Sequence, residues 1–367
     1  MRILHLNAGV ALDWGGPSRV VREMAAALAA RGHDVTVMGG DVAPGRVRAP
    51  LGTPNQPAPP PDSYTLRTFR SDWLGPPYPS VAMLAAVWRE ARSFDVAHVH
   101  GLFNAPMTSA MWALRARGVP YVVRPCGMLD AWSLRERAKV KSLYYHAIER
   151  ANLEGAAAIQ VSTAHEEEAV RALRSSTPIE RLPQGVGHEL VRPEPSPWPR
   201  PYLLFLGRVA RKKGLALLIE ATRGLELDVV LVGPDELGHG AELDRLAHAR
   251  VHRVGAERNA ARKAAWYAHA AAFVLLSEDE NFGIVVVEAA QQGAPLIVSE
   301  QVGLAADVAA DGAGLVVPRD AVRVRQAIDE VLARGRPAYA TGTRRLAERF
   351  AWEPLAARLE ALYRRII

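Results

Sequence analysis

The sequence contains a single cysteine, Cys126, in 367 residues. One thiol excludes an internal disulfide and a zinc site built from several cysteines, and it fits a reducing compartment. Long apolar runs are also lacking: the best candidate, residues 264–276, is shorter than the roughly 20 residues that cross a bilayer and carries His269 in its middle. Hydrophobic residues at 49% and charged residues at 23% exclude a disordered or collagen-like chain. At roughly 150 residues per domain, the length predicts two domains.

The start of the chain also lacks features of an export signal. The strand-like MRILHL has no basic segment before it, no following apolar core of signal-peptide type and no small-residue cleavage site. Together with the single cysteine, this predicts a cytoplasmic protein.

Positive charge is spread unevenly. The net charge is +6, and residues 1–185 contain 21 Lys and Arg against 16 Asp and Glu, so that +5 of the excess lies in the first half. A basic half favours an anionic partner such as phospholipid head groups, a pyrophosphate-linked substrate or nucleic acid. The alternative is an arginine-rich composition that reflects the genome. We expect no nucleic acid, because no basic helix of the recognition type accompanies the charge.

The first half alternates strand-like and helix-like segments. Short apolar runs typical of buried strands lie at 2–8, 34–39, 97–100, 121–123 and 158–161. Residues 19–30 have helical apolar spacing, so the chain opens with a βαβ unit. The pattern predicts a parallel sheet covered by helices over residues 1–185, with a long proline-rich surface loop at 41–63.

A second α/β domain follows a proline-rich linker. Prolines alternate in RPEPSPWPRP within residues 186–201, which favours a stiff extended connection. The strand pattern then resumes at 202–207, 228–232, 273–276 and 296–298. This predicts a domain over residues 202–349, and a final helix over residues 346–367 packs against either domain.

Three motifs follow strands of the predicted sheets, where ligands of open parallel sheets bind. The first contains Gly15 and Gly16, in Asp-Trp-Gly-Gly-Pro-Ser between the first strand and the first helix. Paired glycines let backbone N–H groups approach a phosphate, although such turns are also common for structural reasons.

The second motif is the basic loop Gly-Arg-Val-Ala-Arg-Lys-Lys-Gly at residues 207–214. Arg208 offers a bidentate grip on a pyrophosphate and Lys213 a point charge. The alternative is a solvated basic loop.

The third motif is the strongest and pairs two carboxylates across a strand-to-helix transition. Glu280 and Glu288 flank Phe282 and Gly283. Helix geometry places Glu288 about one turn inside the helix, where it can bond a ribose, while Glu280 faces a sugar. The N–H groups of residues 283–285 then point at a phosphate. An acidic loop before an amphipathic helix explains the charges alone, but not their pairing with a basic loop earlier in the domain.

The order and spacing of these motifs resemble glycosyltransferase family 4, the retaining nucleotide-sugar glycosyltransferases of GT-B fold. The resemblance runs nearly end to end and includes RGHDV at 31–35, GAGLVVP at 312–318 and Phe-Ala-Trp at 350–352. It implies two Rossmann-like lobes that face a cleft, an acceptor-binding lobe first and a nucleotide-sugar lobe second, and a last helix, residues 350–367, that crosses back to the first lobe.

The resemblance also implies roles for residues around the donor. Arg208 and Lys213 would neutralise the leaving diphosphate, and Glu280 would contact sugar hydroxyls. The other implied donor contacts are the diphosphate contact of Gly15 and Gly16, the base-binding loop at Gly255, the backbone of Phe282, Gly283, Ile284 and Val285, and the ribose contact of Glu288. Because no Asp-x-Asp motif follows a strand, we expect no metal and no other cofactor beyond a UDP- or GDP-sugar.

The acceptor side departs from the family pattern. Many relatives carry histidine where this chain has Cys126, so the donor-sugar contact of that histidine is vacant or passes to a neighbour such as Arg124. The stretch RPCGMLDAWSL at 124–134 resembles bacterial exopolysaccharide and lipopolysaccharide enzymes, which places Arg124, Asp130 and Trp132 on the acceptor side. A buried tryptophan and a helix-capping aspartate are the structural alternatives. His100 is a further acceptor candidate, although a lone histidine is more often structural.

The resemblance predicts transfer of a hexose or N-acetylhexosamine to a glycan or lipid-linked acceptor. Basic and aromatic residues along a predicted helix at 133–150 would suit peripheral contact with the inner face of the cell membrane, or simply a solvated helix face. Two alternatives to transfer stay open: a GT-B epimerase or hydrolase that needs no acceptor, and a sugar-nucleotide-binding protein without turnover. The sequence leaves the donor base, the sugar, the acceptor and the linkage undetermined.

Overall fold

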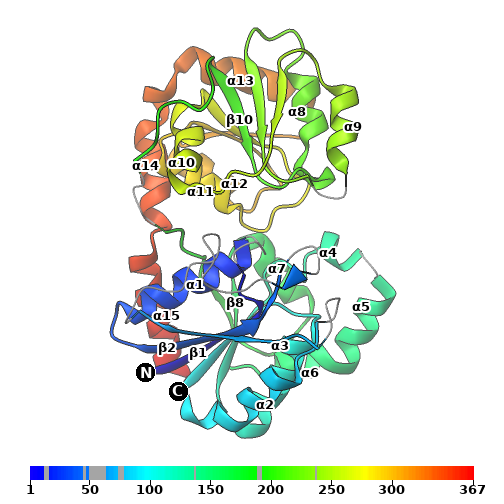
Figure 1. Ribbon diagram of the computed structural model, residues 1–367, viewed down its shortest axis with the longest axis vertical. Helices are drawn as coiled ribbons and strands as arrows, with labels where there is room; N and C mark the ends of the chain where they lie inside the picture. The colour runs from blue at the N-terminus through cyan, green and yellow to red at the C-terminus, as the bar shows by residue number, and fades with distance from the viewer. Residues whose placement is uncertain are drawn as a thin grey trace. The chain divides into compact units, whose positions relative to one another are not determined.

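The computed structural model describes residues 1–11, 16–43, 47–48, 63–72, 78–135, 138–187, 192–235 and 238–367. The chain divides into two compact units (Figure 1). The first unit comprises Met1–Gly187 together with Trp352–Ile367, and the second comprises His188–Ala351. Within the described residues, no helix is both long enough and apolar enough to span a bilayer.

The first unit is built on a seven-stranded sheet of order β5-β2-β1-β6-β7-β8-β9. Every neighbouring pair is parallel, which confirms the predicted parallel sheet. The strands are β1 (Arg2–Gly9), β2 (Asp34–Gly40), β5 (Thr65–Phe69), β6 (Val96–His100), β7 (Tyr121–Arg124), β8 (Ala158–Val161) and β9 (Ile179–Arg181). The half-exposed edge strand β5 lacks a continuous apolar run and was not predicted.

The predicted loop at 41–63 lies partly outside the described residues. Within it, β3 (Val42–Ala43) and β4 (Val47–Arg48) form a short antiparallel pair. The remaining described residues continue directly from β2 or lead into β5.

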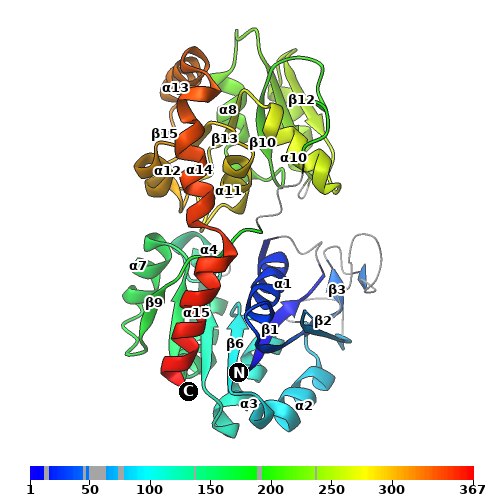
Figure 2. The same cartoon turned by 90° about the vertical axis from the view of Figure 1, so that its left-hand side faces the viewer.

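Helices cover both faces of this sheet. In Figures 1 and 2, α1 and α15 lie on one face, and α2, α3 and α6 cover the other. The helices are α1 (Gly16–Ala29), α2 (Val81–Glu90), α3 (Ala105–Arg117), α4 (Ala131–Arg135), α5 (Ala138–Tyr144), α6 (Arg150–Glu154), α7 (Ala164–Ala172) and α15 (Trp352–Ile366).

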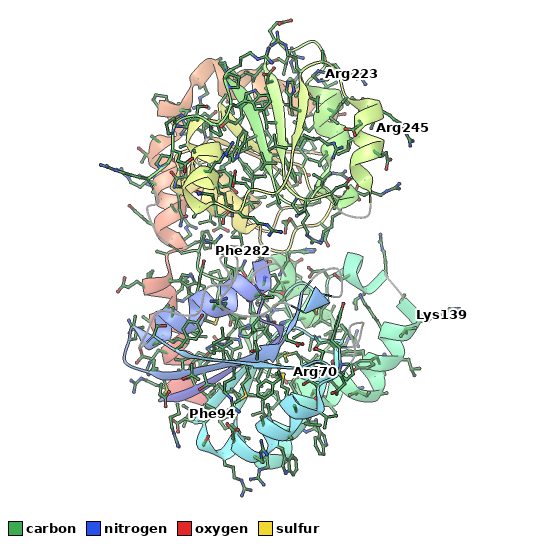
Figure 3. All side chains as sticks on the ribbon, viewed as in Figure 1. Arg70, Phe94, Lys139, Arg223, Arg245 and Phe282 are labelled. Atoms are coloured by element: carbon green, nitrogen blue, oxygen red, sulfur yellow. The ribbon has the colours of Figure 1, made fainter. Side chains whose placement is uncertain are left out.

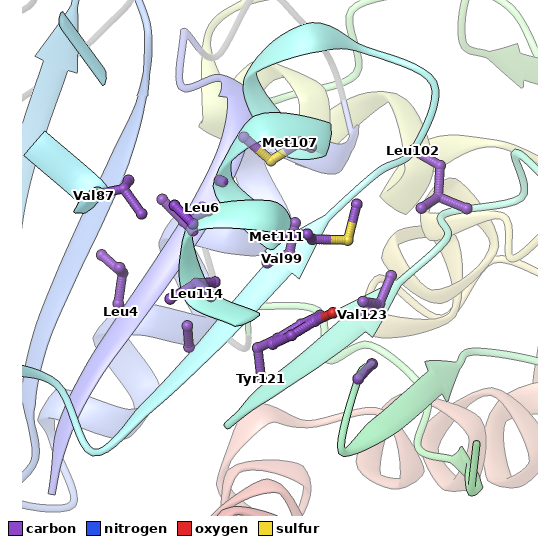
Figure 4. Packing of buried hydrophobic residues seen from close by; sticks show 14 of the residues in the cluster. Leu4, Leu6, Val87, Val99, Leu102, Met107, Met111, Leu114, Tyr121 and Val123 are labelled. Atoms are coloured by element: carbon purple, nitrogen blue, oxygen red, sulfur yellow. The ribbon is translucent and has the colours of Figure 1, made fainter. Parts of the chain in front are cut away.

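The inner side of α3 fills the core of the first unit. Asn104 caps the helix by accepting a hydrogen bond from the Met107 N–H, and α3 ends at Gly118. Figure 4 shows the α3 side chains against strands β1, β6 and β7; the labelled residues there include Leu4, Leu6, Val99, Met107, Met111, Leu114, Tyr121 and Val123. Each of these side chains is at most 1% exposed, so the sheet and α3 form one dry interface.

The predicted helix at 133–150 is helical throughout its described residues, and residues 136–137 lie outside them. It consists of α4, α5, a π-helical turn at Tyr145–Glu149 and α6. The turn coincides with the buried carboxylate of Glu149, which accepts hydrogen bonds from the Phe103 N–H at 2.9 Å and the Thr108 hydroxyl at 2.7 Å. The extra residue of a π turn re-aims a side chain, and here it accompanies a tie between this segment and the start of α3.

The second unit contains a six-stranded sheet of order β12-β11-β10-β13-β14-β15. All its pairs are parallel. The strands are β10 (Tyr202–Leu206), β11 (Asp228–Val232), β12 (Val251–Val254), β13 (Ala272–Leu275), β14 (Leu296–Ser299) and β15 (Gly314–Val317). The helices are α8 (Leu215–Ala221), α9 (His239–Leu246), α10 (Ala260–His269), α11 (Ile284–Gln291), α12 (Ala305–Asp311), α13 (Ala321–Arg334) and α14 (Ala340–Arg349).

The described part of the proline-rich segment packs on the second unit. The Trp198 indole N–H donates to Asp228 at 2.9 Å, and its ring contacts those of His252 and Trp266. Residues 192–201 therefore belong to this unit and do not form a free spacer, because Trp198 anchors them.

The predicted final helix at 346–367 is two helices, α14 and α15, broken at Phe350 and Ala351. Phe350 packs edge-on against Phe282 in the second unit. Trp352 instead donates to Glu23 of α1 at 2.8 Å in the first unit. The break occurs where neighbouring aromatic side chains bury in different units, and α15 returns to the first unit as the GT-B resemblance implies.

Candidate active site

The basic loop 207–214 lies against the end of β13 in the second unit. Arg208 is exposed at its start, and residues Arg211–Lys213 form a 3-10 turn. Gly214 follows with φ +69°, and a Cβ there would lie 2.0 Å from the Leu276 carbonyl oxygen. Glycine is required because the loop backbone approaches the backbone after β13 so closely.

This close approach brings the second and third sequence motifs together. The Lys213 ammonium forms an ion pair with the Glu280 carboxylate, and the Glu278 N–H donates to the Lys212 carbonyl at 2.7 Å. Lys213 is 9% exposed. The sequence predicted that Lys213 contacts a phosphate and that Glu280 contacts a sugar, but it did not predict that the two side chains contact each other. An ammonium has three donors, so Lys213 can hold Glu280 and still bond an anion.

The acidic loop is also held from the β14 side. The Glu280 N–H donates to the Gln301 carbonyl at 3.2 Å, and the Gly303 N–H donates to the Glu280 carbonyl at 2.7 Å. Arg319 forms an ion pair with Glu278 at 2.9 Å. These contacts fix the Glu280 backbone from two sides, which pre-organises its carboxylate.

Helix α11 begins directly after this loop. Gly283 precedes it with φ +90°, and Ile284 and Val285 form its half-buried first turn. Their N–H groups have no partner one turn earlier in the helix and carry its positive end. Phe282 is 3% exposed and packs on Phe350, so it can meet a ligand only through its backbone.

Glu288 lies one turn inside α11 and is held by two side chains that sequence reasoning missed. The Lys263 ammonium contacts one carboxylate oxygen at 2.7 Å, and the Tyr267 hydroxyl donates to the other at 2.9 Å. Lys263 and Tyr267 are four residues apart on α10 and therefore on one helix face. That spacing was a readable signal, but only the fold shows that α10 faces α11.

The remaining residues predicted to contact the nucleotide sugar are Gly255 and, in the first unit, Gly15 and Gly16. Gly255 is exposed after β12, and a Cβ there would meet no described atom within 4 Å. Gly16 is the first residue of α1, and Gly15 lies outside the described residues. The Ser18 hydroxyl donates to the Gly9 carbonyl at 2.7 Å, which ties α1 to the end of β1.

The acceptor-side candidates are mostly buried. His100 ends β6 and is 1% exposed, Arg124 ends β7 and is 2% exposed, and Asp130 is 1% exposed. Arg124 donates a hydrogen bond to Gln184. Trp132 lies in α4, and its side chain is outside the described residues.

His100 belongs to a cluster of three buried histidines on β1 and β6. His5 and His100 share a hydrogen bond of 3.0 Å, and the His98 ring stacks on that of His100 with centroids 4.3 Å apart. Burial lowers the pKa of His5 to about 3. Burial also lowers the pKa values of His98 and His100, and the neighbouring histidines and Arg124 lower them further. All three rings are therefore neutral at pH 7.

Cys126 is an unsuitable nucleophile. Its backbone is left-handed with φ +58°, and burial raises the pKa of its thiol, although the Arg124 charge opposes that shift. A thiol with a raised pKa carries little thiolate at neutral pH, and the thiolate is the reactive form.

Comparisons with known proteins agree with this architecture. A family model described as a glycosyl transferase 4-like domain matches residues 15–185, and one described as glycosyl transferases group 1 matches residues 189–344. D-inositol 3-phosphate glycosyltransferase 1 of Catenulispora acidiphila is 29% identical over 77% of this chain and 75% of its own length.

Solved structures share the fold over the whole chain. Sucrose-phosphate synthase of Thermosynechococcus elongatus superposes with a TM-score of 0.73 at 24% identity, covering 100% of this chain and 98% of that one. HepE of Anabaena, solved in complex with UDP and glucose, gives a TM-score of 0.71 at 14% identity, with 98% of both chains covered.

The chain has two parallel-sheet units, and charged loops lie at the carboxyl end of the second sheet. Together with the matching family models, this architecture identifies a glycosyltransferase of GT-B type. The two matched domains together span most of the chain. The chain belongs to glycosyltransferase family 4, as the motifs indicated.

Proposed function

We propose that this chain transfers a hexose or N-acetylhexosamine from a UDP- or GDP-sugar to a glycan or lipid-linked acceptor in polysaccharide biosynthesis, with retention of configuration. The second unit binds the donor and the first unit the acceptor. The observation that carries this proposal is the convergence of Lys213, Glu280 and the start of α11 at one edge of the second sheet.

The cations of this edge act on the leaving group. Breakage of the bond between the anomeric carbon and the diphosphate oxygen develops negative charge on the diphosphate. Arg208 and Lys213 neutralise that charge, and the first N–H groups of α11 add oriented donors. The acceptor oxygen attacks the anomeric carbon from the face of departure, and its proton passes to the leaving diphosphate. Under this proposal two fixed cations supply the charge stabilisation that a divalent metal provides elsewhere.

The carboxylates of the same edge orient the donor. Glu280 accepts hydrogen bonds from sugar hydroxyls while Lys213 holds it, and Glu288 accepts bonds from the ribose. Lys263 and Tyr267 keep the Glu288 carboxylate in one rotamer, so little conformational freedom is lost when the donor binds.

A second class of acceptor is a small phosphorylated polyol or sugar. It is favoured by the similarity to a D-inositol 3-phosphate glycosyltransferase. The excess of cations in residues 1–185 suits an anionic acceptor of either class.

The first test is thermal stabilisation of the purified chain by UDP, GDP, ADP and dTDP. One diphosphate at 100 times its dissociation constant should add about 2.7 kcal/mol to the free energy of unfolding. Arg208→Ala should abolish the shift. Arg211→Ala is the matched control, because Arg211 lies in the same loop, is 82% exposed and pairs with Glu242 on the surface. Absence of a shift with all four diphosphates would contradict the donor site.

The second test separates transfer from the two alternatives. With the sugar nucleotide chosen by the first test, diphosphate release should require a glycan, lipid-linked or phosphorylated acceptor. Release without any acceptor would favour a hydrolase, and isomerised sugar nucleotide would favour an epimerase. Nucleotide binding with no turnover across the acceptor panel would favour a binding protein.

A further inference from the structure

Large apolar side chains are exposed on one helical layer of the first unit. On α2 and α3, Trp88 is 37% exposed and Trp112 is 49% exposed, and Val81 at the start of α2 is 69% exposed. On the neighbouring segment, Leu143 is 72% and Ile148 is 41% exposed. Exposed aromatic and aliphatic groups gathered in one region mark an interaction surface.

The core does not need these side chains. The opposite sides of α2 and α3 already fill the interior with Met83, Val87, Met107 and other buried residues. The Trp88 and Trp112 rings instead stack on each other outside the core, with centroids 5.2 Å apart and planes 17° apart.

The stacked indoles separate two open hollows. An almost entirely apolar one is lined by Val81, Leu84, Ala85, Trp88, Arg89 and Trp112. A second, of about 460 Å³, is lined by residues of α3, the π turn and α6 that include Thr108, Trp112, Arg115, Tyr144 and Ile148. Because Trp112 lines both, the hollows form one continuous surface, which we call the indole face.

Cations surround the indole face. The Arg117 guanidinium lies 5.4 Å from the centre of the Trp88 ring, and Arg89 lines the apolar hollow. Lys139 projects outward from α5 (Figure 3). Apart from the buried Arg124, the described arginines and lysines from α2 to α6 are Arg89, Arg92, Arg115, Arg117, Arg135, Lys139, Lys141 and Arg150.

Among the described residues of this layer, the carboxylates do not balance these cations. Glu149 is buried, Glu90 pairs with Arg67 of β5, and Glu154 pairs with Arg150. The indole face is therefore an apolar centre with a positive rim.

We infer that the indole face docks on an anionic lipid bilayer, with Trp88 and Trp112 at the level of the head groups. Tryptophan prefers this level because its ring is apolar and its N–H is polar. The surrounding arginines and lysines are attracted to acidic head groups. A second copy of the chain is a poorer occupant, since two positive rims would repel each other.

This surface overlaps the one that the sequence suggested and adds α2 and α3 to it. In the segment predicted as a basic and aromatic helix at 133–150, Tyr144 lines the second hollow, and its hydroxyl bonds Thr108 at 2.9 Å. The Lys141 ammonium bonds the Ser133 carbonyl. The exposed indoles come from α2 and α3, which the sequence did not single out.

The test is co-sedimentation of the full chain with phosphatidylcholine vesicles, with and without phosphatidylglycerol. We expect binding only when phosphatidylglycerol is present. The double variant Trp88→Gln/Trp112→Gln should bind at least about tenfold more weakly. Arg89→Gln/Lys139→Gln should lose about fivefold per charge and should lose less in high salt.

Val322→Gln/Leu332→Gln is the matched control, because these exposed apolar residues lie on α13 of the second unit, and it should bind like the parent chain. Unchanged melting temperatures show that the variants fold. No sedimentation with anionic vesicles would overturn the inference, as would binding that depends on the cations but not on the tryptophans. Self-association that disappears in the tryptophan variant would overturn it in favour of a dimer interface. Nucleotide stabilisation is measured in parallel, so that loss of lipid binding is distinguishable from failure of the donor site.

Discussion

The polar residues at the carboxyl ends of the two sheets are arranged differently. In the second unit, Lys213 pairs with Glu280 and Lys263 with Glu288, on loops and helices beyond the strands. In the first unit, His100 and Arg124 end their strands with side chains that are at most 2% exposed and bonded to other protein groups. Paired charges on loops and helix ends beyond the strands can exchange a partner for a charged ligand, whereas the neutral buried ring of His100 costs stability when it is protonated. The comparison supports a donor site in the second unit.

The largest effect should come from removing a cation at the carboxyl end of the second unit's sheet. Lys213→Ala should lower kcat by about 10²- to 10³-fold, because the developing charge on the diphosphate loses one fixed partner. Initial rates, measured with the donor that the thermal-stabilisation test selects, check this prediction. Arg211→Ala again serves as the control. A variant that transfers sugar at the parent rate would remove Lys213 from the proposed mechanism.

The next largest effect should come from the close backbone contact between Gly214 and the segment after β13. Gly214→Ala adds a Cβ 2.0 Å from the Leu276 carbonyl oxygen, and Gly312→Ala adds one in open space at the same φ of +69°. The left-handed backbone costs each variant about 1 to 2 kcal/mol, and crowding costs Gly214→Ala about 1 to 3 kcal/mol more. Urea unfolding measures both. Equal losses would show that the loop can move away from β13 freely.

Acid should weaken the first unit through its buried histidines. Their pKa values are lowered in the fold from the ordinary value of 6.5, to about 3 for His5, so below pH 6.5 the unfolded chain binds protons that the folded chain does not. The free energy of unfolding is then fully retained above pH 6.5. It falls below that pH by up to about 1.4 kcal/mol per histidine per pH unit.

Urea unfolding from pH 7 to pH 5 tests this dependence. A variant that lacks one histidine of the cluster, such as His5→Asn, should show a shallower fall than the parent chain. A parent profile that is flat over this range would mean that the cluster accepts protons without unfolding.

The smallest effect should come from the helix that covers the cluster. The Tyr363 hydroxyl of α15 bonds His98 Nδ1 at 2.7 Å. Tyr363→Phe leaves that buried nitrogen without this partner and should cost about 1 to 2 kcal/mol. Thermal unfolding measures the loss. A stabilised variant would show that the hydroxyl does not hold α15 in place.

The local pattern allowed much of the fold and part of the candidate site to be predicted. Apolar runs marked the buried strands, and the motif containing Glu280 and Glu288 marked a strand-to-helix transition that the structure contains. The edge strand β5 was missed because a half-exposed strand lacks an apolar run. The break between α14 and α15 was missed because helical periodicity does not reveal that Phe350 and Trp352 pack in different units.

Contacts between distant residues were beyond the sequence pattern. The four-residue spacing of Lys263 and Tyr267 was visible, but not that it faces Glu288. The burial of His100 and Arg124 was also hidden, since a polar residue at the end of a strand can turn either inward or outward.

The sequence by itself determined the family, the two parallel sheets and the residue types available for phosphate and sugar, because these depend on local spacing and order. Tertiary structure alone decided which charges pair, which polar side chains are buried and where the indole face lies. The physical reason is that pairing energy and desolvation depend on neighbours brought together by packing. Lys213 and Glu280, for example, pair although they are 67 residues apart along the chain.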